Sequence, residues 1–191
     1  MMTTLQTHAY DTKVLVKEVH DRLVHDIENV ARMAGIPVPM IWTSATQYCN
    51  EDEIDYTRRL HLHAAEGTFG YLYVGKQHGE HPVSMRMMAL AGACVRNFIN
   101  ARVMTVQDLL AAVRKDNVPS PTVLLIPNFF VSTEHGGNLP SWQASGLMSV
   151  LLNRMAAGQQ TYVYVDDLDA MKAQYGDMVY QHLAAYFQRA E

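Results

Sequence analysis

The sequence predicts an α/β fold of three layers, in which helices cover both faces of a parallel β-sheet. Two observations predict it. Along the second part of the chain, apolar and β-branched runs alternate with stretches of helical periodicity, and the runs at 122–126 and 161–165 are apolar or aromatic almost throughout. Such continuous runs are typical of strands buried on both faces. Strands that alternate with helices are joined by right-handed crossovers, which place helices on both sides of the sheet.

The chain before residue 69 predicts a helical appendage. Residues 11–34 have helical periodicity, and Gly35, Pro37 and Pro39 end the pattern. The apolar residues on one face of this helix are Val16, Val19, Leu23, Ile27, Val30 and Ala34. This face either docks on the main core or binds a partner. Residues 39–53 predict a connection, and residues 54–62 predict either a helix end or a strand.

From residue 69 onward the strands and helices alternate. Strands are expected at 69–75, 101–106, 122–126 and 161–165, and helices at 83–100, 105–113, 141–157, 169–174 and 178–189. Thr105 is the expected N-cap of the second of these helices, and Gly158 ends the third. The expected order across the sheet is first, fourth, third and second strand. We therefore expect residues 1–53 to form an N-terminal helix and connection, and residues 54–191 to form the α/β domain.

The composition is that of a globular protein. The 191 residues include 15 Lys and Arg against 19 Asp and Glu, and 49% are hydrophobic, which excludes a disordered chain. No run is long enough to span a membrane, and the first residues lack the pattern of a signal peptide. Two cysteines fit a reducing cytoplasm, and a net charge of −4 does not support binding to nucleic acid by charge alone.

Ligands in parallel sheets bind beyond the carboxyl ends of the strands. After the first strand, Gly75, Lys76, Gly79 and Ser84 occupy the place of a phosphate-binding loop. The Gly-Lys-Ser/Thr ending of such a loop is missing, and Lys76 stands at the wrong end. After the third and fourth strands stand Asn128 and Asp166, the remaining candidates for nucleotide contacts.

Residues 147–183 carry a resemblance to a known family. A helix ends near Arg154, a strand and a short helix follow, and Tyr175-Gly176 precedes a terminal helix. Earlier, Val106-Gln107-Asp108-Leu109-Leu110 is similar in order and spacing. The chain resembles the DnaC/IstB branch of the AAA+ ATPases, the helicase loaders and insertion-sequence ATP-binding proteins, over about residues 66–187. The resemblance implies a P-loop NTPase fold, and we expect no C-terminal lid domain.

The departures from that family concern its catalytic residues. The lysine and threonine of the phosphate loop are missing, and the acidic pair falls on Pro127 and Asn128. The sensor residue falls near Asp166, and the arginine finger would fall near Gln181 and His182. A working ATPase needs these groups to hold magnesium, orient water and neutralise charge. The resemblance therefore implies a pseudo-ATPase without cofactor.

The function that the resemblance implies is an adaptor role in DNA replication, transposition or mobile-element biology. The partner would be a helicase, a transposase or another AAA+ subunit, with a homo-oligomer left open. One alternative is a divergent ATPase that uses Lys76 with Asp166 or Asp167, because residues 162–169 also form an apolar strand followed by acids. Another is a module that binds a small ligand at the same strand ends.

Two further groups of residues are weighed as sites. Partner contacts are expected at Val16, Val19, Leu23 and Ile27 and at Phe129 and Phe130, which precede a Gly-rich loop. His61 and His63 would share one face if they lay on a strand, and with Cys49, His78 or His81 they could bind zinc. No CxxC or HExxH pattern supports zinc, so we expect no metal site. Because the ATPase motifs are also missing, we expect no catalytic residue.

Overall fold

The protein forms a five-stranded sheet in which every strand pair is parallel. This computed structural model describes residues 17–75, 80–132 and 141–190. The strands are β1 (Gly70–Val74), β2 (Ala101–Val103), β3 (Val123–Phe130), β4 (Gln160–Val165) and β5 (Phe187–Arg189). Their order is β2-β3-β4-β1-β5. The predicted α/β class and the predicted order of the first four strands are confirmed.

The fifth strand differs from the expected last helix. The helix α10 (Asp177–Tyr186) ends earlier than residue 189, and the chain continues as β5 beside β1. Phe187 pairs with Gly70 and is buried there, and a side chain at Gly70 would collide with the Phe187 ring. Burial of this aromatic ring at the sheet edge is favourable, and a continued helix would carry Phe187 away from that position.

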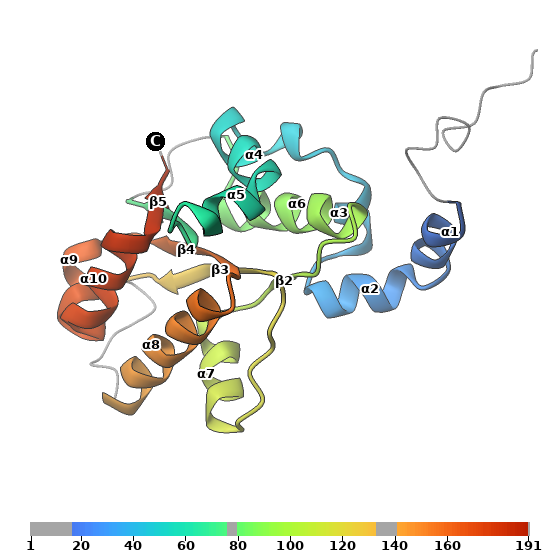
Figure 1. The fold of residues 1–191 in the computed structure, drawn as a ribbon. Helices are drawn as coiled ribbons and strands as arrows, with labels where there is room; N and C mark the ends of the chain where they lie inside the picture. The colour runs from blue at the N-terminus through green and yellow to red at the C-terminus, as the bar shows by residue number, and fades with distance from the viewer. Residues whose placement is uncertain (1–16, 76–79, 133–140, 191) are drawn as a thin grey trace, which may run out of the picture.

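Helices cover both faces of the sheet (Figure 1). One layer holds α1 (Lys17–His25), α2 (Ile27–Ala34), α3 (Val38–Trp42), the 3-10 turn η2 (Ala45–Gln47), α4 (Glu51–Arg58), α5 (Leu60–Ala65) and α6 (Val83–Arg96). The other layer holds α7 (Val106–Arg114), α8 (Ser141–Ala156), α9 (Leu168–Tyr175) and α10. Thr105 caps α7 by accepting a hydrogen bond from Asp108 N at 3.1 Å, as expected.

The N-terminal part is more helical than the sequence pattern predicted. The single helix expected at 11–34 is interrupted at Asp26, and Gly35 ends α2 with φ +68°. The segment expected as a connection contains α3 and η2, and residues 54–62 lie in α4 and α5 rather than in a strand. Asn50 and Glu53 form a reciprocal capping box at the start of α4. Short helices with such caps have too few turns to show a clear apolar period.

Two apolar cores lie on opposite faces of the sheet and share its strands. Tyr71 and Tyr73 of β1 face the core beneath α2–α6, whereas Leu72 faces the core beneath α7–α10. The boundary expected between residues 53 and 54 falls inside α4, and Ile41 is fully buried in the first core. The N-terminal helices thus complete the covering of the sheet. Among the described residues, no helix is long and apolar enough to cross a membrane.

Candidate functional site

Two of the expected ligand-binding residues, Gly75 and Asp166, lie at the carboxyl edge of the sheet. Gly75 follows β1 with φ +87°, a conformation that favours glycine, and its N–H donates to Val165 O at 3.0 Å. Ser84 lies in the first turn of α6, and Asp166 directly follows β4. Lys76 and Gly79 lie outside the described residues.

Asp166 joins the ends of β3 and β4. Its Oδ2 accepts hydrogen bonds from Ser132 N at 2.8 Å and Ser132 Oγ at 2.6 Å. Its Oδ1 is buried and has no hydrogen-bond partner among the described residues. A buried acceptor without a donor is costly, so Oδ1 is an unsatisfied polar atom at this edge of the sheet.

Asn128 does not end a strand, as the sequence suggested, but lies within β3. The pairing of β3 with β4 is irregular between Ile126 and Phe130, and Asn128 stands in this bulge. Its Oδ1 accepts from Val106 N at 3.0 Å, and its Nδ2 donates to Gln107 Oε1 at 2.9 Å. Asn128 therefore attaches β3 to the start of α7, and its amide is engaged in this contact.

The two acids after β4 have different roles. Asp167 is the N-cap of α9, because its Oδ1 accepts from Ala170 N at 2.9 Å. Its side chain is exposed at the helix start, whereas Asp166 is turned toward Ser132. The two acids thus do not form one pair. Of the two, Asp166 is the one that is free of the cap of α9, and it lies beside Gly75.

The residues expected to contact a partner are mostly buried. Phe129 and Phe130 are 0% and 1% exposed, and both rings pack edge-on against Tyr175. Because β3 extends to Phe130, these side chains point into the core and do not belong to a surface loop. Leu23 is buried and Ile27 packs against the first core. Val16 and the side chain of Val19 lie outside the described residues.

The histidines weighed as zinc ligands lie on a helix. His61 is exposed and His63 is buried, because two residues along α5 do not share a face. His63 stacks on Tyr56 with ring centroids 4.0 Å apart, and burial lowers the pKa of its imidazole. His78 lies outside the described residues. Where residues are described, no group of three or more His, Cys, Asp or Glu side chains is placed to hold a metal.

A buried ionic cluster lies beneath α4, and the sequence did not reveal it. Glu53 is 0% exposed, and Arg86 NH2 on α6 approaches its Oε2 to 2.7 Å. Tyr73 of β1 donates to Glu53 Oε1 at 2.5 Å, and Asn50 N donates to Oε2 at 2.8 Å. Burial, together with the charge of Glu53, raises the pKa of Tyr73. The cluster fixes α4, β1 and α6 relative to one another.

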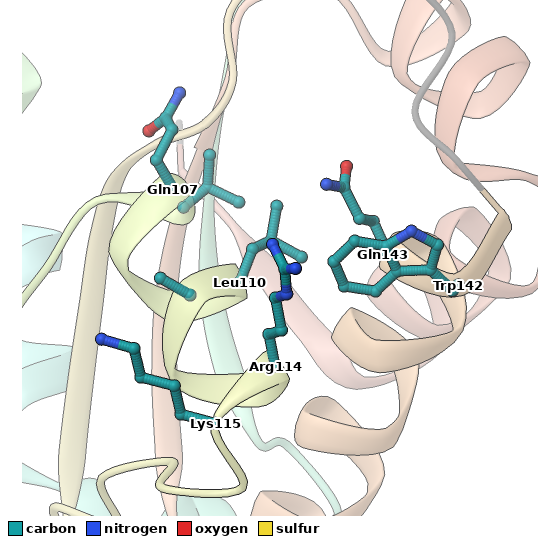
Figure 2. A pocket seen from close by; sticks show the side chains of 8 residues that line it. Gln107, Leu110, Arg114, Lys115, Trp142 and Gln143 are labelled. Carbon is teal, nitrogen blue, oxygen red and sulfur yellow. The ribbon is translucent and has the colours of Figure 1, made fainter.

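A groove of about 590 Å³ runs between α7 and α8 (Figure 2). Its lining residues are Val106, Gln107, Leu110, Ala111, Arg114, Lys115, Trp142 and Gln143. In this view the Arg114 side chain runs along the flank of α7 that faces Trp142, and Lys115 lies on the other flank of α7. The sequence reasoning missed this groove because its residues come from helices separated by a strand and a loop.

Comparison with known proteins identifies the fold. No protein-family model and no curated protein sequence matches the chain. The similar solved structures include a DNA replication initiation factor (TM-score 0.52, 9% identity), the replication initiator DnaA bound to AMPPCP and single-stranded DNA (TM-score 0.52, 10%), and AMPPCP-bound DnaA from Aquifex aeolicus (TM-score 0.53, 9%). The fold is similar to that of DnaA. The aligned part covers 78% of this chain.

The chain spans about half the length of these DnaA structures, with 49% or 50% of each covered. At 9–10% identity, the similarity concerns the fold alone. In this DnaA-like fold, the position expected for an arginine finger holds an exposed Gln181 and a buried His182. His182 packs against the rings of Tyr186 and Phe187, and burial lowers its pKa.

Proposed function

We propose that this chain is a catalytically degenerate AAA+-like protein that acts through protein contacts, as a helicase-loader-like adaptor. Its process would be DNA replication, transposition or mobile-element function, and its family the DnaC/IstB branch. The observation that carries the proposal is the carboxyl end of β3, which offers Pro127, Asn128, Phe129 and Phe130 where an ATPase needs carboxylates.

The chemistry of phosphoryl transfer explains the weight of this observation. An ATPase of this fold class needs acidic oxygens to hold magnesium and a neighbouring polar group to orient the attacking water. Pro127 has no such group, and both polar atoms of the Asn128 amide already bind α7. The two phenylalanines are buried. The end of β3 is therefore built for packing.

The proposed process rests on the solved neighbours. They are described as DNA replication initiators, and one of them is bound to AMPPCP and single-stranded DNA. For this chain we propose a protein partner, which is a helicase, a transposase or another AAA+ subunit, with a homo-oligomer as the remaining arrangement. We also propose a cytoplasmic location, which the free, buried thiols of Cys49 and Cys94 suit, and no resident cofactor.

A divergent ATPase is the second candidate. One observation favours it: the turn at Gly75 and the unpartnered Oδ1 of Asp166 lie on the same edge, joined through the hydrogen bond from Gly75 N to Val165 O. Lys76 would then meet the phosphates, and Asp166, rather than the capping Asp167, would act through magnesium. A small ligand other than ATP would use the same edge.

Titration calorimetry with ATP and magnesium, followed by a phosphate-release assay, tests the proposal. The expected result is no turnover above a buffer control. Micromolar binding with turnover that is lost in Lys76→Ala, but kept in the matched variant Lys172→Ala, would overturn the degenerate assignment in favour of the divergent ATPase. Lys172 is a suitable control because it is exposed on α9 and pairs with Asp177.

A further inference from the structure

The groove between α7 and α8 carries positive charge. Arg114 and Lys115 line it, and none of its described lining residues is Asp or Glu, although the whole chain carries a net charge of −4. Within the part of the chain that the structure describes, neither cation forms an ion pair with a carboxylate. An uncompensated positive rim on an acidic protein favours an acidic ligand.

The walls of the groove suit a side chain larger than water. Val106 and Leu110 form an apolar floor, and the Trp142 indole stands 47% exposed at the opposite wall, facing Arg114 (Figure 2). Tryptophan and arginine are the residue types that contribute most to protein–protein binding when they line a desolvated pocket. A volume of about 590 Å³ lies within the range of ligand-sized clefts.

One polar atom of the groove lacks a partner. Gln143 Oε1 is buried and has no hydrogen-bond partner among the described residues. A buried carbonyl oxygen that lacks a donor is costly, and a turn of the Gln143 amide into the groove would let the N–H group of a ligand satisfy it. The backbone of a peptide supplies such a group at every residue except proline.

These three features point to one kind of occupant. We propose that the groove between α7 and α8 docks a segment of a partner protein that combines apolar side chains with acidic ones. The apolar side chains lie on Leu110 and Trp142, a carboxylate meets Arg114, and a backbone N–H reaches Gln143 Oε1. This proposal rests on the proposed adaptor function and specifies where and by what chemistry the partner binds.

Single-stranded nucleic acid fits the groove less well. Strands of DNA or RNA are held by a row of cations that follows the phosphates, together with several aromatic platforms. The described lining residues offer two cations, which lie on different flanks of α7, and one aromatic ring. Its floor is apolar, where a phosphate would lose its hydration without compensation.

The test selects ligands from a phage-displayed library of random 16-residue peptides on the whole chain. Binding of the enriched peptides is then measured through tryptophan emission in the Trp42→Phe variant, in which Trp142 is the remaining tryptophan. A 20-nucleotide oligothymidylate is titrated in parallel. The expected peptides are rich in Asp or Glu and in aromatic or aliphatic residues, and they shift the Trp142 emission.

Charge reversal supplies the second measurement. Arg114→Glu should weaken these peptides by about tenfold or more, because attraction at the rim becomes repulsion. Arg189→Glu, an exposed arginine in β5 at the other edge of the sheet, should leave their affinity unchanged. A selection on Arg114→Glu should enrich basic peptides instead.

Three outcomes would overturn the proposal. They are enrichment of basic or uncharged peptides on the unaltered chain, no enrichment of peptides that shift Trp142 emission, and oligothymidylate binding that is tighter than peptide binding and lost in Arg114→Glu. These outcomes are separable from failure of the adaptor function. A chain that turns over ATP loses the adaptor assignment whatever the groove binds, whereas a chain without turnover and without peptide binding loses the groove alone.

Discussion

Glu53 is a carboxylate removed from solvent, and its neighbours explain how the fold tolerates it. Arg86 donates to it through Nε at 3.1 Å and approaches it with NH2 at 2.7 Å, while Tyr73 and the Asn50 backbone satisfy the remaining lone pairs. Burial opposes the charge of Arg86, but the hydrogen bond and charge of Glu53 outweigh it and raise the pKa of Arg86. Such a cluster is costly to break at one member.

Glu53→Gln should therefore lower the free energy of unfolding by about 3 kcal/mol, because Arg86 would keep its charge beside a neutral amide. The matched control Glu51→Gln, on the exposed face of the same helix, should change it by less than about 1 kcal/mol. Urea denaturation measures both. The double variant Glu53→Gln with Arg86→Met should recover part of the loss, and equal losses in Glu53→Gln and Glu51→Gln would contradict the role of the cluster.

At the scale of single residues, the sequence predicted the place of some candidate residues in the fold and misjudged the place of others. Gly75 and Asp166 lie on the predicted edge because their place follows from strand ends alone. The places of Asn128, Phe129 and Phe130 were predicted wrongly because β3 continues through Pro127 in a bulge. A bulge of this kind has no local sequence pattern that would predict it. Glu53 escaped notice because its partners stand 20 and 33 residues away in sequence.

Among the elements, α3 and α6 make an unusually close crossing. Gly92 lies in the middle of α6, and a Cβ atom there would overlap the backbone carbonyl of Met40 in α3. Near the C-terminal end of α6, Arg96 NH1 also donates to Ile41 O and to Thr43 O. The first core thus depends on a helix that the sequence pattern assigned to a connection.

Gly92→Ala should lower the free energy of unfolding by about 2 kcal/mol, because a backbone atom cannot move aside as a side chain can. The matched control is Gly146→Ala in α8, where the new Cβ would lie 2.9 Å from Val113 Cγ1, the end of a side chain. There the gain in helix propensity, up to about 1 kcal/mol, should offset the contact. Thermal unfolding compares the two, and a similar loss at both positions would show that α3 does not constrain α6.

Long apolar elements were predictable from the sequence, and most of the short ones were not. The strands β1, β3 and β4 could be predicted from their continuous apolar runs, and the helices α6 and α8 could be predicted from their length. The elements α3, η2 and β5 have five, three and three residues, too few for a period to emerge. Their places are set by tertiary burial, which a single sequence does not display.

On the scale of the whole molecule, the sheet is the common wall of two cores. The side chains of each central strand alternate between them, as Leu124 and Leu125 of β3 do. Because neither core can lose its strands without exposing the other, we expect the helices before residue 54 and the rest of the chain to unfold together. Such joint unfolding agrees with the sequence-based alternative in which the N-terminal helix docks on the main core.

The two tryptophans report on the two layers separately. Trp42 lies in α3 and Trp142 in α8, and their side chains are 48% and 47% exposed, so removing either ring should disturb the fold little. In the Trp142→Phe variant the emission of Trp42 reports the unfolding of the layer of α1–α6 in urea. In the Trp42→Phe variant the emission of Trp142 reports the unfolding of the layer of α7–α10. If the cores are coupled through the sheet, the two emission curves should give one midpoint and one slope, once each is corrected for the stability of its variant by circular dichroism. If the emission of Trp42 changed at a lower urea concentration than that of Trp142, the N-terminal helices would detach while the sheet stayed folded. The sheet would then not need these helices over β1 and β4 in order to fold.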